Sequence, residues 1–222
     1  IVTSRFSGAA TAFNARGYVT AIPEYRKFEL SAQAEYGMTR DLTLLFRAAG
    51  EDVRAFGARE TGPGASEIGA RLRLADVGAG VVSAQALAIA PGVVGRSGLD
   101  ETRRAGADVR LLVGAPFSAL GLRGFFSLEA GYRAQGARAG EWRVETTLGW
   151  RPRENWLVLT QTYFAAGRLA PARIAGLRLK SDMSVVYRFH RNWSAQAGYG
   201  STVAGRAALR ESGPFVALWA RF

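Results

Sequence analysis

The sequence predicts an all-β chain, an antiparallel transmembrane β-barrel of about twelve strands with short turns at one end and longer loops at the other. Three observations predict this fold. Apolar and polar residues alternate in segments of roughly 10 residues, the length that a tilted strand needs to cross a bilayer. Along the chain, short spacers between these segments mostly alternate with long ones. Aromatic residues gather beside the short spacers, where a strand would leave the lipid.

Composition narrows the alternatives. The chain has 222 residues and is 48% hydrophobic, yet no apolar run reaches about 18 residues, which excludes a transmembrane helix. The absence of cysteine excludes disulfides and Cys-based metal sites. The first residue is Ile1 and no leader is visible, so we expect that a signal peptide was removed or never present. The net charge of +11 favours an anionic partner, unless it only reflects an Arg-rich genome.

The first three segments define the pattern. Apolar residues occupy every second position, and mostly polar or charged residues lie between them. The apolar faces are Phe28, Leu30, Ala32, Ala34 and Tyr36 in 25–36; Leu42, Leu44, Phe46 and Ala48 in 42–49; and Ile68, Ala70, Leu72 and Leu74 in 67–74. Because neighbouring side chains of a strand point to opposite faces, each segment predicts a strand with one apolar and one polar face.

The alternation continues to the end of the chain. The apolar faces of the next four segments are Val82, Ala84, Ala86 and Ala88 in 81–90; Val109, Leu111 and Val113 in 105–114; Phe126, Leu128, Ala130 and Tyr132 in 123–134; and Trp142, Val144, Thr146, Leu148 and Trp150 in 141–151. The last four segments are 156–165, 174–188, 193–202 and 213–222. Segment 156–165 is ambiguous, because Leu157 and Leu159 share a face with Gln161.

The spacers predict how the strands are connected. Short spacers such as RPREN and FHRN alternate mostly with longer ones at 50–65, 91–104, 135–140, 165–173 and 203–212. If the last strand ends at the short-turn side, one more strand must precede 25–36, which gives twelve, an even number. We expect it around Ala9 to Val19, although residues 1–22 could instead form an N-terminal plug or tail. Residues 1–222 would then be a single domain.

Aromatic residues predict the level of the membrane surface. They flank the short turns on or next to the apolar register, as expected where lipid tails meet headgroups. The predicted interface aromatics are Tyr36, Trp150, Trp156, Tyr187, Trp193 and Phe222, with Phe117 beside them. An opposite girdle is expected from Tyr25, Tyr132, Trp142, Phe164 and Tyr199. The alternative is a soluble β-sandwich with these aromatics in its core, which would bury the apolar face and leave two sheet edges.

The C-terminal sequence PFVALWARF alternates and stops on Phe222. It resembles the last strand of Gram-negative outer-membrane β-barrels, which ends in an aromatic that the assembly machinery recognises. The stretch YGMTRDLTL is similar to their periplasmic hairpins. This resemblance implies a porin-like protein of the Gram-negative cell outer membrane, with short periplasmic turns and longer extracellular loops. Twelve-stranded porins for acidic oligosaccharides are similar in size and basic character, but no specific family is matched.

The polar faces predict the side chains that line the lumen and contact a solute. The basic candidates are Lys27, Arg47, Arg71, Arg73, Arg110, Arg133, Arg143, Arg178 and Lys180, with Arg151 and Arg221 nearer the ends of strands. The acidic candidates are Glu29, Glu67, Asp108, Glu129, Glu145 and Asp182, with Glu35. Basic groups outnumber acidic ones, and an arginine-lined path favours anions.

Two functions remain open at this point. The first is a channel that passes small anionic solutes through the Arg-lined lumen. The second is a non-conducting structural or export-associated barrel that anchors a partner or an envelope assembly, with ion pairs such as Glu129 with Arg143 closing the lumen. Membrane lipids are partners in both cases, and loop arginines suit glycolipid phosphates.

Other classes receive little support. The only histidine, His190, lies in a short turn, so neither a catalytic nucleophile–base pair nor a metal cluster is indicated. We therefore expect neither an enzyme nor a cofactor, and enzymatic lipid remodelling is the weakest hypothesis. Basic residues are spread over all segments rather than gathered in one patch, so nucleic acid is not an expected partner.

Overall fold

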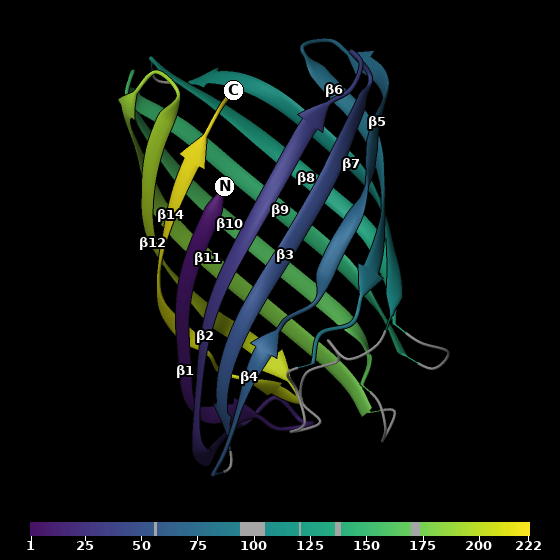
Figure 1. The fold of residues 1–222 in the computed structure, drawn as a ribbon, viewed down its shortest axis with the longest axis vertical. Coiled ribbons are helices and arrows are strands. Elements are labelled where there is room, and N and C mark those ends of the chain that lie inside the picture. Colours follow the sequence, from purple (N-terminus) through teal and green to yellow (C-terminus); the bar gives the residue numbers. More distant parts are fainter. Residues whose placement is uncertain (56, 94–104, 120, 136–138, 170–173) are drawn as a thin grey trace.

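Twelve antiparallel strands close into a ring in the computed structural model (Figure 1). The structure describes residues 1–55, 57–93, 105–119, 121–135, 139–169 and 174–222. The strands are β1 (Val2–Phe13), β2 (Val19–Gly37), β3 (Leu42–Ala55), β4 (Ala58–Pro63), β5 (Ser66–Val77), β6 (Gly80–Ala90), β7 (Gly106–Ala119), β8 (Leu122–Gln135), β9 (Ala139–Arg153), β10 (Trp156–Leu169), β11 (Ile174–His190), β12 (Trp193–Arg206), β13 (Ala208–Leu209) and β14 (Ser212–Ala220). Among these residues, no helix is long and apolar enough to cross a membrane.

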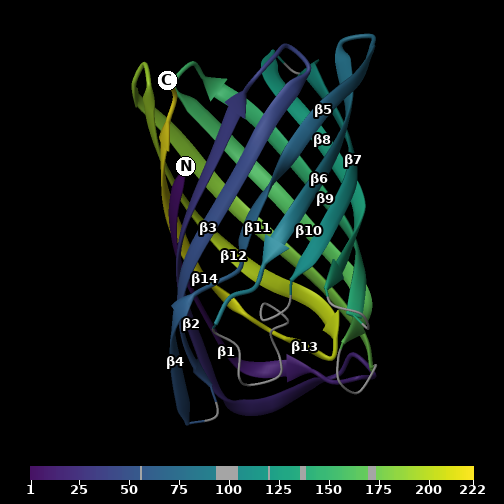
Figure 2. The same cartoon turned by 45° about the vertical axis from the view of Figure 1, so that its right-hand side comes forward.

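The ring is closed by its first and last strands. Each main strand pairs with the next along the chain, and β1 pairs with β2 on one side and with β14 on the other. The β1–β14 ladder is short: it pairs Val2 with Leu218 and ends at Gly8 with Ser212, after which β13 pairs with the end of β1. Figures 1 and 2 show β1 and β14 side by side in both views. The predicted twelve-stranded barrel is confirmed.

The apolar register faces outward, as an outer-membrane barrel requires. Leu111, Ile68 and Met183 are each about three-fifths exposed on the outer wall, whereas Asp108 and Asp182 lie buried inside. Turns of two residues join strands at one end, for example Glu154–Asn155 between β9 and β10. The apolar outer wall therefore meets lipid, and the charged register lines an enclosed space.

The first strand lies earlier than expected. It spans Val2–Phe13 rather than Ala9 to Val19, and Asn14 caps the turn that follows by accepting hydrogen bonds from the backbone N–H groups of Arg16 and Tyr18. The outward register of β1 includes Ser4 and Gly8, so its two faces differ little in polarity. Because the two faces differ so little in polarity, hydrophobic alternation did not reveal this strand in the sequence.

Several strands continue past the predicted length at the end opposite the short turns. β2 begins at Val19 rather than 25, and β4 pairs with β3 inside the stretch 50–65 that was predicted as a loop. Exposed residues there include charged side chains, such as an Arg26–Glu24 pair at 2.6 Å. Because these extensions project beyond the lipid, no apolar face was needed, and hydrophobic alternation could not reveal them.

The inner wall is not uniformly charged. On β10, β11 and β14 the inward side chains include the buried apolar residues Leu159, Val186, Phe215 and Ala217. This resolves the ambiguous segment 156–165, in which Leu157 and Leu159 face inward with Gln161. Tyr25 also faces inward and packs with Ala9, Val53 and Ala55, so its predicted place in an outer aromatic girdle is wrong.

Candidate functional site: the charged lumen

A polar hollow of about 460 Å³ lies inside the barrel. Six arginines and four glutamates line it, together with neutral polar side chains such as Gln85 and Tyr163. The charged residues are Arg5, Arg47, Arg71, Arg110, Arg133 and Arg143, with Glu29, Glu67, Glu129 and Glu145. Strand alternation places them, since each occupies the inward register of its strand.

Asp108 is the centre of the largest ion-pair cluster. Its side chain is 1% exposed, and its carboxylate accepts hydrogen bonds from Arg110 Nε at 2.6 Å and from Arg133 Nε at 2.8 Å. Arg143 approaches the same carboxylate at 3.7 Å. Arg110 also reaches Glu145 at 2.9 Å and Glu129 at 3.2 Å. The predicted Glu129–Arg143 pair is replaced by this arrangement: Glu129 pairs with Arg110, and Arg143 with Glu141 and Glu145.

A second cluster lies on β2 and β3. Lys27 Nζ is 3.0 Å from Glu51 and 3.4 Å from Glu29, and Arg47 donates to Glu29 at 2.8 Å. Register explains the contacts, because Glu29 lies opposite Glu51 in the β2–β3 ladder with Lys27 and Arg47 on either side. Alternating signs of charge keep the carboxylates from repelling one another.

Other pairs join strands that are not neighbours in the wall. Arg133 of β8 donates to Glu67 of β5 at 2.8 Å, and Arg5 of β1 pairs with Asp182 of β11. Arg71 lies 3.4 Å from Glu35. Such pairs reach across the curved inner surface and narrow the passage. They also satisfy charges that would be costly to bury alone.

The remaining predicted lumen residues lie nearer the ends. Arg73 pairs with Asp76 beside the β5–β6 turn, where both side chains are largely exposed. Lys180 pairs with Glu211 at 2.8 Å, just before β14. Arg178 occupies the same inward register of β11, opposite Gly205 of β12.

The charged residues of the inner wall that the sequence analysis missed include Arg5, Glu51, Arg188 and Glu211. Arg5 was missed because the first strand was expected later in the chain. Glu51 and Glu211 were missed because they lie in stretches that were predicted as loops. Arg188 lay at the end of the predicted segment 174–188 but was not counted among its inward residues, and β11 extends to His190. Counting every second residue from Asp182 would have placed Arg188 inside.

The predicted interface aromatics lie along the short-turn rim. Tyr36, Trp156, Tyr187, Trp193 and Phe222 are exposed and Trp150 is half-buried. Trp156 and Tyr187 are opposite each other in the β10–β11 ladder, with ring centroids 4.8 Å apart. Of the expected opposite girdle, Tyr132 and Trp142 form an edge-to-face pair at 5.2 Å. Their contact with the lipid surface remains a prediction.

His190 lies beside the β11–β12 turn, where its Nδ1 accepts a 3.4 Å hydrogen bond from the backbone N–H of Asn192. In the part of the chain that the structure describes, no three His, Cys, Asp or Glu side chains are grouped to hold a metal ion.

Gly200→Ala is expected to destabilise the barrel by about 1–3 kcal/mol through overpacking. A methyl group at this inward position of β12 would overlap the Asp182 carboxylate and crowd Arg5 Nη1, and so force the pair apart. Urea unfolding in detergent measures the loss. Gly50→Ala is the matched control, since nothing lies within 4 Å of its added methyl. Equal stability of the two variants would contradict the prediction.

Fold and lumen together define the chain as an outer-membrane β-barrel with a charged interior. The sequence matches no family model and no curated protein. Solved structures do match. An outer-membrane channel from Pseudomonas putida F1 is 13% identical with a TM-score of 0.68 over 98% of this chain and 93% of that one. The NanC porin is 7% identical with a TM-score of 0.64 over the whole of both chains. The KdgM porin is 8% identical with a TM-score of 0.58 over 100% and 99%. The predicted outer-membrane barrel fold is thus confirmed.

Proposed function

We propose that the protein is an outer-membrane channel of a Gram-negative bacterium that passes small anionic solutes. The observation that carries this proposal is the polar hollow of about 460 Å³, whose lining has six arginines against four glutamates. A water-filled path with surplus guanidinium groups raises the local concentration of anions and repels cations. The channels and porins that share the fold support a transport role.

The class of solute follows from the arginines. Guanidinium groups form paired hydrogen bonds with carboxylates and phosphates, so a carboxylated or phosphorylated solute suits this lining. The KdgM porin has also been solved with oligogalacturonate, an anionic sugar polymer. That likeness is one of fold, so the solute class for this chain rests on its own lumen charges.

Conductance in a planar lipid bilayer tests the proposal. An open state is expected, with a reversal potential in a salt gradient that shows anion preference. Arg71→Glu should reduce the anion-to-cation permeability ratio at least about twofold, because it reverses a charge in the hollow. Arg59→Glu is the control: it makes the same change on β4, outside the ring, and should leave the ratio unaltered. An open but cation-selective channel would contradict the anionic solute.

A second candidate is a non-conducting barrel that anchors a partner or an envelope assembly. The ion pairs between non-neighbouring strands favour it, because Arg5–Asp182 and Arg133–Glu67 narrow the passage. Silence across all voltages, together with a partner protein that co-purifies with the barrel, would support this function and exclude the channel.

A further inference from the structure

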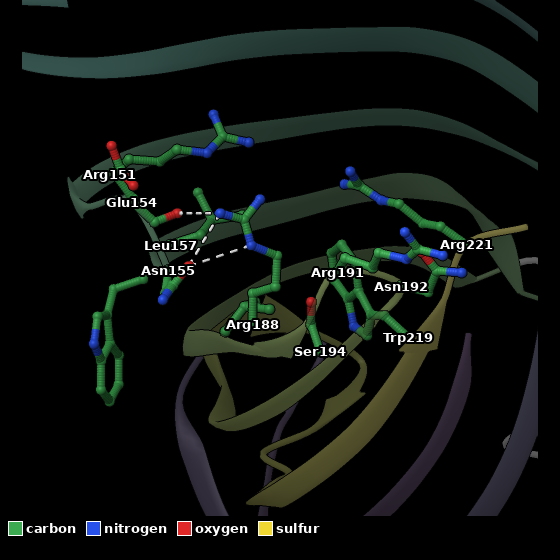
Figure 3. A pocket seen from close by; sticks show the side chains of 12 residues that line it. Arg151, Glu154, Asn155, Leu157, Arg188, Arg191, Asn192, Ser194, Trp219 and Arg221 are labelled. Atoms are coloured by element: carbon green, nitrogen blue, oxygen red, sulfur yellow. Dashed lines mark hydrogen bonds between the residues drawn. The ribbon is translucent and has the colours of Figure 1, made fainter.

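A pocket of about 60 Å³ opens inside the short-turn end of the barrel (Figure 3). Four arginines line it and one glutamate, Glu154. The arginines come from three separate parts of the wall: Arg151 from β9, Arg188 from β11 with Arg191 from the turn that follows, and Arg221 from the end of the chain. Figure 3 shows these side chains around one hollow, with Trp219 at its side.

These arginines differ from those deeper in the lumen. Within the described residues, no carboxylate lies at ion-pair distance from any of the four. Arg188 donates only to neutral acceptors, the Glu154 carbonyl at 3.2 Å and Asn155 Oδ1 at 3.0 Å. A further positive charge is close by, since Arg123 is directly opposite Arg151 in the β8–β9 ladder. The arginines of this pocket therefore have no ion-pair partner among the described carboxylates.

The wall of the pocket is held in place by hydrogen bonds. Three hydrogen bonds to Glu154 and Asn155 of the β9–β10 turn fix the Arg188 guanidinium. Trp219 Nε1 donates to Gln196 Oε1 at 2.9 Å, and Gln196 Nε2 in turn donates to Ser184 Oγ at 2.8 Å. Donors that are already oriented lose little freedom when a ligand binds, which favours affinity.

We propose that this arginine pocket binds an oxyanion, a carboxylate or a phosphate group, at the periplasmic mouth of the barrel. The proposal rests on the proposed channel and deepens it. It adds an anion-binding step at the mouth, where the arginines, unlike those paired in the middle of the lumen, have no carboxylate at ion-pair distance. Guanidinium donors fit both kinds of oxyanion, and a bound oxyanion would relieve the repulsion among the arginines.

Binding can be measured without any conduction. The barrel in detergent micelles is titrated with inorganic phosphate, and separately with citrate, at constant ionic strength, while tryptophan fluorescence is recorded. A saturable change is expected that Trp219→Phe diminishes. The double variant Arg188→Gln/Arg221→Gln should raise the Kd at least about tenfold, while Glu154→Gln should lower it. Tighter binding of phosphate indicates a phosphorylated solute, and tighter binding of citrate a carboxylated one.

A control variant and the possible contrary results distinguish failure of the pocket proposal from failure of the channel proposal. Arg54→Gln/Arg59→Gln removes the same charge at the opposite end and should leave the Kd unchanged; Arg151→Gln tests the pocket should the first double variant fail to fold. Equal fluorescence changes in all variants, or none with either anion, would overturn the pocket. Saturable binding without conductance would overturn the channel and support the pocket. Anion-selective conductance that Arg188→Gln/Arg221→Gln leaves unaltered would overturn the pocket alone.

Discussion

Asp108→Asn is expected to lower the free energy of unfolding by about 3–5 kcal/mol, the cost of removing one partner from a buried ion pair. The carboxylate of Asp108 holds Arg110 and Arg133 within 2.6–2.8 Å and Arg143 at 3.7 Å, so the substitution leaves three guanidinium groups close together without it. Urea titration of the barrel in lipid vesicles, followed by tryptophan fluorescence, measures the loss.

Asp76→Asn is the matched control for this substitution. Asp76 also pairs with an arginine, Arg73, but at the exposed β5–β6 turn, where an ion pair contributes little. We expect its unfolding curve to match that of the unaltered protein. If Asp108→Asn were as stable as Asp76→Asn, the arginine cluster would not depend on the buried carboxylate, and the energetic account of the lumen given above would be wrong.

Leu111→Arg is expected to cost about 2–4 kcal/mol on folding into a bilayer, the penalty for a charged side chain on the lipid face at mid-depth. Leu111 lies in the middle of β7 on the outer wall and is 59% exposed. Reversible folding into vesicles of a phosphatidylcholine lipid gives the difference in free energy between the variant and the unaltered protein.

The depth dependence makes this experiment specific. Leu122→Arg places the same charge on the same wall but at the start of β8, beside the short turn, where the cost should fall to about 0–1 kcal/mol. A soluble sheet with an exposed outer face would show no such gradient. Equal costs at the two positions would therefore refute a lipid-facing outer wall.

The sequence predicted the fold where lipid imposed a contrast between faces. The segments from 25–36 to 213–222 all became strands, because a wall between lipid and a polar interior must alternate. Prediction failed where that contrast is absent: in β1, whose outward residues include Ser4 and Gly8, and in β4, which lies outside the ring. The inward leucines of β10 were ambiguous because part of the inner wall is apolar.

The sequence predicted many of the residues that line the lumen, but it did not predict which of them pair with one another. The alternation of side chains along each strand was enough to assign residues such as Arg110, Asp108 and Glu129 to the inward face. The structure brings these three together. Pairing between distant strands, such as Arg5 with Asp182, depends on the curvature and stagger of the ring, which no local pattern encodes. The arginine pocket was missed because its members come from strand ends and turns.

The short ladder between β1 and β14 has a consequence for biogenesis. It joins Val2 to Leu218, so the contact of greatest sequence separation is also the one that completes the wall. Until it forms, both terminal strands expose unpaired backbone groups that invite association with other chains. Contacts this distant along the chain form slowly. We therefore expect the nascent protein to need a chaperone until β1 and β14 have paired.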